Sequence, residues 1–254
     1  KQDEYYLISA GAWTAYDADF LMKAAEDFMG KGGGYIDIHD VTTQWGVYAL
    51  AGPNSRALLN DLVKDADPAT VLSNERFPWL SYGDIELGMC PVRAVRVAYT
   101  GELGWELHYP IEFGRYLWDL IWSVGEKHGL KAVGARAQNW LRQEKSYRAF
   151  GNELGRDATP LEADLPRFVD LSKEFNGKAK MIETGIRSKC VTVLIDGPVD
   201  ADPWGKEALI KDGVKQGLFR NVNPQLFYFT ATGAADRFFS ARLVLKHCFD
   251  TDTL

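Results

Sequence analysis

An acidic residue set between glycines is the first feature of the sequence that could do chemistry. In "VRVAYTGELGWELHYP", residues 95–110, Glu102 follows Gly101 and precedes Leu103 and Gly104. A carboxylate has two coplanar acceptor oxygens, so it can accept paired hydrogen bonds from a ring N–H and a neighbouring amino group. Glu102 is therefore a candidate for holding a flat, nitrogen-rich ring whose face approaches the glycine backbone.

A simpler interpretation of the same turn stays open. Glu102 could be a solvated turn residue, with the glycines supplying backbone angles that other residues resist. Tyr99 and Trp105 flank the turn and could form apolar walls for a ligand. Both could equally belong to the core of a sheet, which is the commoner place for aromatic residues in strands.

The overall composition limits the possible partners. The chain has 254 residues, 46% of them hydrophobic, which is enough for one large core or two ordinary ones. Its net charge is −6, and no run of Lys and Arg suited to a phosphate backbone occurs, so nucleic acid is not an expected partner. No apolar run approaches the roughly 20 residues of a membrane span, so we expect no membrane insertion.

The cysteines and histidines predict neither disulfides nor a metal site. The 3 cysteines and 4 histidines are scattered, without C-x-x-C or H-E-x-x-H spacing. A reducing compartment fits best. The first residue is Lys and no signal segment follows it, so we expect the chain to be a piece of a longer protein.

The first part of the chain mixes strands and helices. Apolar spacing predicts a strand over 5–11 and a helix over 14–29. The "GKGGG" stretch at 30–34 lacks the frame of a phosphate loop and is interpreted as a helix C-cap and turn. Alternating residues predict a hairpin of strands over 35–41 and 45–52.

The next elements follow the order β-α-β-β-α and indicate an α+β fold. They are predicted at 45–52, 54–63, 92–99, 105–110 and 111–129, with a possible last strand at 131–134. This order is that of a ferredoxin-like split βαβ unit, with both helices on one face of a sheet. The inward residues expected for the second helix are Leu117, Trp118, Ile121 and Val124.

The remainder is divided into the end of the first domain and a second one. A helix is predicted over 135–148 and an ordered loop over 158–166. We expect a first domain over 1–184 and a β-rich, barrel-like domain over 185–254, because a β-rich stretch begins near "KCVTVLIDGP".

Three longer stretches resemble a known family. They are "RVAYTGELGWELHYP" at 96–110, "GARAQNWLRQEKSYRAFGNELGRDATPLEADLPRFVDLSKEFNGKAKM" at 134–181 and "SKCVTVLIDGP" at 188–198. Together they resemble the folate-binding, aminomethyltransferase-like region of dimethylglycine and sarcosine dehydrogenases, which is related to the glycine-cleavage T-protein. The resemblance ends near residue 217, because the sequence after about 218 departs from the barrel strand that these relatives have.

The resemblance implies a tetrahydrofolate site. The acid of the family's Y-T-G-E turn holds the pterin, which here implies Glu102, with Tyr99 beside it. The arginine of the L-R-x-E helix implies Arg142 near the folate, although a mid-helix arginine is more often part of an ion pair. Ser9 stands where T-proteins have an asparagine beside the ligand. Three more arginines are weaker candidates for the folate tail: Arg136, Arg148 and Arg156. Glu162 matches a family motif and is interpreted as structural.

The implied function is capture of a one-carbon unit. In the family, a flavin oxidises an N-methyl group and tetrahydrofolate takes up the product as 5,10-methylenetetrahydrofolate. No G-x-G-x-x-G turn predicts FAD binding here, so the flavin belongs to an upstream domain. The family's catalytic aspartate would precede Lys1, so no catalytic residue is assigned.

Two alternative functions and the compartment stay open. One alternative is a stand-alone T-protein-type aminomethyltransferase or tetrahydrofolate-dependent demethylase. The other is a folate-binding or assembly module without catalysis. The expected location is the cytoplasm, or the mitochondrial matrix if the source is eukaryotic.

Overall fold

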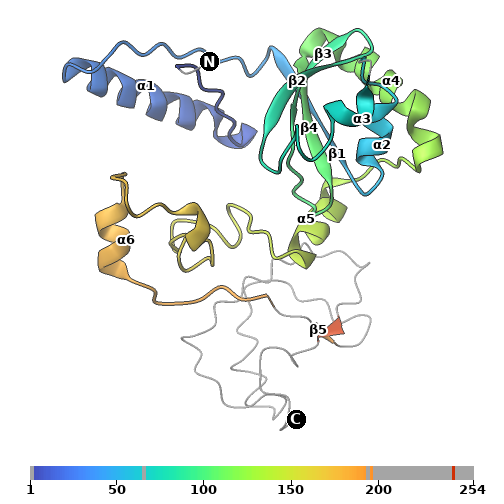
Figure 1. Ribbon diagram of the computed structural model, residues 1–254. Coiled ribbons are helices and arrows are strands. Elements are labelled where there is room, and N and C mark those ends of the chain that lie inside the picture. Colours follow the sequence, from blue (N-terminus) through green and yellow to red (C-terminus); the bar gives the residue numbers. More distant parts are fainter. Residues whose placement is uncertain (1–2, 65–66, 193–194, 197–241, 244–254) are drawn as a thin grey trace. The chain divides into compact units, whose positions relative to one another are not determined.

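Figure 1 shows the computed structural model, which describes residues 3–64, 67–192, 195–196 and 242–243. Contacts along the chain define two compact units. The first unit comprises residues 1–97 and 104–130, and the second comprises residues 98–103 and 131–254. The segment 98–103, which carries Glu102, thus belongs to a different unit from the strands on either side of it.

The first unit is built on a four-stranded antiparallel sheet with the order β1-β4-β3-β2. Its strands are β1 (Trp45–Ala51), β2 (Tyr82–Leu87), β3 (Cys90–Val95) and β4 (Gly104–Pro110). β4 pairs with both β1 and β3, so that Val47 and Arg93 lie opposite the same residue, His108. β1 and β3 therefore run parallel to each other on either side of β4. The α+β class is confirmed.

Helices cover one face of this sheet. They are α2 (Ser55–Asn60), α3 (Pro68–Val71) and α4 (Gly114–Gly125), all on the same side of the sheet in Figure 1. Side chains alternate between the faces of a strand, so Trp105, Leu107 and Tyr109 of β4 all point to the helices. They are almost completely buried and share one core with Leu117 and Ile121 of α4.

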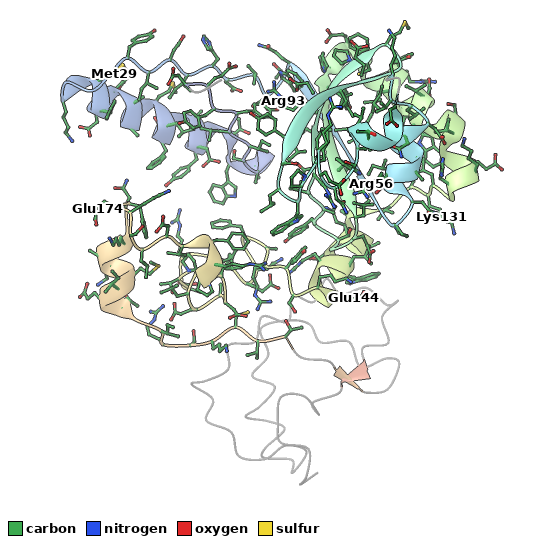
Figure 2. The ribbon with its side chains drawn as sticks, viewed as in Figure 1. Met29, Arg56, Arg93, Lys131, Glu144 and Glu174 are labelled. Atoms are coloured by element: carbon green, nitrogen blue, oxygen red, sulfur yellow. The ribbon has the colours of Figure 1, made fainter. Side chains whose placement is uncertain are left out.

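The other face of the sheet carries a mixture of charged, polar and apolar side chains, among them His108 and the exposed Val47 opposite it. Arg93 lies on this face, and Figure 2 labels it. His108 is 1% exposed, and its Nδ1 forms a 3.2 Å hydrogen bond with the hydroxyl of Tyr6. The Arg93 guanidinium lies 5.4 Å from the centre of the Tyr6 ring. Side-chain contacts of Tyr6 thus connect the N-terminal segment to the sheet.

Several predicted strands are wrong. Residues 5–10 and 33–41 form no strand, so the predicted hairpin between 35–41 and 45–52 does not exist. β1 pairs with β4 instead, along its whole length from Trp45 opposite Pro110 to Ala51 opposite Gly104. Residues 131–134 also form no strand, while the edge strand β2 was not predicted.

The predicted helices form, with some changes. α1 spans Thr14–Gly30, as expected. It ends at the glycine turn, where Gly32 has φ 85° and the N–H of Gly33 donates to the carbonyl of Phe28 at 3.0 Å. Trp118 of α4 is 43% exposed, so its predicted inward position is wrong. Short 3-10 turns lie at Gly11–Trp13, Ile111–Phe113 and Glu126–His128.

The described part of the second unit has little regular structure. Its elements are α5 (Ala135–Glu144), a 3-10 turn (Pro166–Phe168), α6 (Lys178–Thr184), and the short strands β5 (Ile195–Asp196) and β6 (Arg242–Leu243). β5 and β6 pair antiparallel. Apart from these two strands, the predicted C-terminal barrel lies outside the described residues, so that domain and its boundary at 184 stay predictions.

Candidate functional site

The turn that carries Glu102 is part of a longer connection than predicted. β3 ends at Val95 and β4 begins at Gly104, so the strands are joined by residues 96–103 and not by a tight turn. Gly101 has φ 73°, a left-handed conformation that favours glycine. Glu102 therefore belongs to the second unit, together with the rest of residues 98–103.

Lys145 is the charged neighbour of Glu102. Its Nζ lies 3.7 Å from Glu102 Oε1, and each side chain is 46% exposed. No other charged group of the described residues contacts the Glu102 carboxylate. The carboxylate is therefore neither buried in a closed network nor fully solvated, and it keeps acceptor capacity for a ligand.

The stem of Lys145 fills the space beside Gly101. A Cβ atom added to Gly101 would lie 2.2 Å from Lys145 Cγ, far closer than two carbon atoms can approach. The space at Gly101 was interpreted above as room for a flat ligand. In the structure it is occupied by the lysine stem, so Gly101 allows Lys145 to reach Glu102.

The end of α5 positions Lys145. Glu144, labelled in Figure 2, is the last residue of the helix, and Ser146 follows Lys145 with φ 60°. The N–H of Ser146 donates to the carbonyl of Gln143, and the N–H of Tyr147 donates to that of Arg142, both at 2.8 Å. These two bonds form a Schellman motif, which normally uses glycine at the left-handed position.

Tyr99 and Tyr147 form an aromatic pair near the acid. Their ring centres are 6.3 Å apart with an angle of 28° between the planes. The Tyr99 hydroxyl donates to the carbonyl of Arg148 at 2.9 Å. Burial raises the pKa of Tyr99 above its usual value, so the hydroxyl stays protonated and acts as a donor.

Thr100 contributes a polar atom that lacks a partner. Its Oγ1 is buried and makes no hydrogen bond within the described part of the chain. An unpaired buried hydroxyl costs free energy, so Thr100 Oγ1 is a candidate partner for a ligand group or a water. The name Glu102 site is used below for Tyr99, Thr100, Gly101, Glu102, Lys145 and Tyr147.

Comparison with family models shows which family the chain belongs to. The model of the GCVT N-terminal domain family matches residues 1–173, which is more than half of the chain. The chain belongs to the GCVT N-terminal domain family. A second family model, described as Tetracyclin repressor-like, C-terminal domain, matches residues 202–254, where the structure describes only Arg242 and Leu243.

Curated relatives of this GCVT domain chain are dehydrogenases and aminomethyltransferases. Dimethylglycine dehydrogenase, mitochondrial, of Mus musculus is 37% identical over 81% of this chain and 23% of its own length. Sarcosine dehydrogenase, mitochondrial, of Mus musculus is 31% identical over 87% of this chain and 23% of its own length. Aminomethyltransferase of Desulfitobacterium hafniense (strain Y51) is 31% identical over 75% of this chain and 50% of its own length. The chain thus spans about a quarter of the dehydrogenases and half of the aminomethyltransferase.

Arg142, the second residue predicted to bind in this GCVT domain, is buried and paired. It is 1% exposed, and its Nη1 donates to Glu153 Oε2 at 2.7 Å and to the carbonyl of Tyr147 at 2.9 Å. Its Nε donates to Asn139 Oδ1 at 2.9 Å. These contacts fix the end of α5, so Arg142 positions Lys145 and Tyr147 through the backbone.

Two other predicted neighbours of the ligand lie in the first unit. Ser9 is exposed in the irregular segment before α1, and its role stays a prediction. Trp105 is 1% exposed and packs edge-to-face on Phe77 with ring centres 5.2 Å apart. Of the two roles left open for Trp105, the structure therefore shows the sheet core.

The weaker arginine candidates differ in their surroundings. Arg148 is engaged with the chain, because its Nε donates to the carbonyl of Ala163 and its Nη1 to that of Ser146. Arg136 and Arg156 are exposed. The role of all three arginines toward a folate tail stays a prediction.

Glu162, which was interpreted as a structural residue, is buried among hydrogen-bond donors of the protein. It is 1% exposed and accepts hydrogen bonds from the N–H of Thr159 and from the Arg187 backbone and guanidinium. The Arg187 guanidinium is the main cause that lowers the pKa of Glu162 from 4.5 to about 2. The pair ties the 158–166 loop to the chain after α6.

Sequence reasoning missed Lys145, Thr100 and Tyr147. Nothing in their spacing shows that residues 98–103 meet residues 145–148, since this contact depends on how the chain folds. The only local signal was a lysine just after a helix with a serine in place of the usual C-cap glycine.

Two negative findings apply to the described residues. None of their helices is both long and apolar enough to span a lipid bilayer. In the same part of the chain, no group of at least three His, Cys, Asp or Glu side chains is arranged to bind a metal ion. Cys90 and Cys190 are buried free thiols.

Proposed function

We propose that this chain is the tetrahydrofolate-binding part of a protein similar to dimethylglycine and sarcosine dehydrogenases. The observation that carries the proposal is Glu102, a half-exposed carboxylate whose only charged neighbour among the described residues is Lys145. Membership of the GCVT domain family and the names of the curated relatives support the same ligand class.

The residues of the Glu102 site fit a pterin ring by their chemistry. The Glu102 oxygens can accept hydrogen bonds from the ring N–H and the adjacent amino group of a pterin. The unpartnered Thr100 hydroxyl can satisfy a further polar atom, and the Tyr99–Tyr147 pair supplies aromatic surface. These groups would orient the ring without any need for a metal ion.

The proposed reaction is capture of a one-carbon unit as 5,10-methylenetetrahydrofolate. Bound tetrahydrofolate supplies two nitrogen nucleophiles for the electrophilic carbon that flavin oxidation of an N-methyl group produces. The contribution of this chain is to hold the ring in a fixed orientation, which raises the effective concentration of those nitrogens. In this proposal the flavin is bound by a different domain of the parent protein, in the mitochondrial matrix.

A stand-alone aminomethyltransferase is the second candidate. It is favoured by the relative from Desulfitobacterium hafniense, half of whose length aligns with this chain. The higher identity to the dimethylglycine dehydrogenase, 37% against 31%, favours the first candidate. Both candidates require the same folate site.

The test is a titration of the chain with folinic acid, followed by tryptophan emission and by calorimetry. Glu102→Gln removes an ionised acceptor, so its affinity should fall by about 1.5–3 kcal/mol, or about tenfold to 150-fold. Glu183→Gln is the matched control, because Glu183 is a 71% exposed acid that pairs with Lys180 in the same unit. Equal affinities of wild type and Glu102→Gln would remove Glu102 from the site.

A further inference from the structure

Glu102 and Lys145 together form a mixed set of hydrogen-bonding groups. The carboxylate has two acceptor oxygens, and the ammonium 3.7 Å from one of them is a donor. The two Glu102 oxygens and the Lys145 ammonium thus present the order acceptor, acceptor, donor. The stem of Lys145 is held against Gly101, so the donor stays on one side of the carboxylate.

The edge of a 2-amino-4-oxopyrimidine ring has the complementary order. Its exocyclic amino group and ring N–H are donors, and its 4-oxo group is an acceptor. When Glu102 accepts from the two donors, the oxo group lies beside the carboxylate oxygen that receives the ring N–H. A donor next to that oxygen, as Lys145 provides, can reach the oxo group.

We propose that Lys145 is a specificity-determining residue that recognises the 4-oxo group of the pterin; this inference rests on the proposed folate site. In the described part of the chain, Glu102 is the one charged group that the Lys145 ammonium contacts. The ammonium can therefore turn toward the oxo group without breaking another ion pair. A 4-amino group at the same place would put two donors face to face, which the site rejects.

The experiment compares tetrahydrofolate with its 4-amino-4-deoxy analogue, bound to the full chain at a pH where both pyrimidine rings are uncharged. Wild type should prefer tetrahydrofolate. Lys145→Met keeps a stem over Gly101 but removes the charge and the donor. It should bind tetrahydrofolate about tenfold more weakly while affinity for the 4-amino analogue stays equal or rises, so that the preference falls about tenfold or more.

Control variants separate recognition from folding and from net charge. Lys145→Arg keeps a cationic donor and should retain the preference. Lys173→Met removes a lysine of the same unit that also lies 3.7 Å from an acid, Asp170, and should bind like wild type. Circular dichroism of each variant shows whether it is folded.

Three results would overturn the inference, and only one of them would also overturn the proposed folate site. If Lys145→Met has the same preference for tetrahydrofolate as wild type, or loses equal affinity for both ligands, Lys145 does not recognise the oxo group. A gain for both ligands shows that Lys145 only competes for Glu102. In each of these cases, weaker binding by Glu102→Gln would still support the folate site. If folded wild type does not bind tetrahydrofolate, the folate site and the role of Lys145 are both wrong.

Discussion

The interiors of the two units differ in the kind of side chain that they bury. In the sheet unit, the core consists of apolar side chains from β1, β2, β3, β4 and the helices on one face. In the described part of the second unit, two of the most deeply buried side chains are charged, Arg142 and Glu162, each 1% exposed. Both are paired, Arg142 with Glu153 and Glu162 with Arg187.

This difference shows what each unit is suited to. Apolar packing is non-directional and stabilises the sheet as a scaffold. Buried ion pairs contribute less net stability, because desolvation offsets their attraction, but they require a defined geometry. We infer that the charged pairs of the second unit serve to fix irregular chain segments, including the end of α5 that positions Lys145.

The largest predicted effect is the loss of one partner of the Arg142–Glu153 pair. Arg142→Met leaves Glu153 buried without its cation, which should cost about 3–5 kcal/mol of unfolding free energy. Urea unfolding followed by circular dichroism measures the loss. Arg156→Met, at an exposed arginine of the same unit, should cost less than about 0.5 kcal/mol. A similarly small loss in Arg142→Met would contradict the contrast between the units.

The matching change in the sheet unit is Leu107→Ala. Leu107 is 0% exposed in the central strand, so truncation should cost about 2–5 kcal/mol through lost burial and a residual cavity. No charge is involved, so the loss should be the same in low and high salt. Ile111→Ala, at a 54% exposed position, is the control. A strong salt dependence of the stability loss in Leu107→Ala would contradict the apolar nature of the sheet core.

The elements of the sheet unit follow from patterns in the sequence, with identifiable exceptions. Alternation and helical spacing predicted β1, β4 and α4, because each has one apolar face that the core buries. Residues 35–41 alternate in the same way but form no strand, since alternation cannot show whether a partner edge exists. Trp118 was assigned to the core because it is apolar, but it is 43% exposed and packs with tilted rings against Tyr48 and Trp122.

Acid should act on the second unit through Glu162. Its pKa is lowered from 4.5 to about 2 in the folded chain, so its contribution is present above pH 4.5 and is lost as the pH falls toward 2. The expected loss is about 2–3 kcal/mol. Thermal unfolding across this pH range, followed by circular dichroism, measures it.

Two variants isolate this contribution of Glu162. Glu162→Gln should have lower stability at neutral pH and lose less on acidification than wild type, because the titrating group is gone. Glu183→Gln, at an exposed acid of the same unit, should follow the wild-type curve. An acid response of Glu162→Gln equal to that of wild type would assign the effect to other groups.

The smallest predicted effect tests the contact between Gly101 and Lys145. Gly101→Ala adds strain at φ 73° and a clash with the lysine stem, so it should cost about 1–2 kcal/mol and weaken folinic acid binding about tenfold. Gly129 has φ 72° and no atom near its Cβ position, so Gly129→Ala has the same strain without the clash. Unfolding of both variants should show a smaller stability loss for Gly129→Ala than for Gly101→Ala, and titration should show a binding loss only for Gly101→Ala. Unchanged binding in Gly101→Ala would contradict the account of this contact.

The candidate site was only partly accessible from the sequence. Glu102 and Tyr99 were named because the turn and the family resemblance point to them. Lys145 was not, because its role depends on a non-local contact between residues 98–103 and the end of α5. Arg142 was named for the ligand, and that role stays a prediction; its described contacts include the buried pair with Glu153.

The most direct test of the central claim is a crystal structure of the chain with bound folinic acid. The pterin amino group and the adjacent ring N–H should lie at hydrogen-bond distance, about 2.7–3.2 Å, from the two Glu102 carboxylate oxygens. A bound folinic acid whose pterin lies elsewhere, with Glu102 still paired only to Lys145, would contradict the claim.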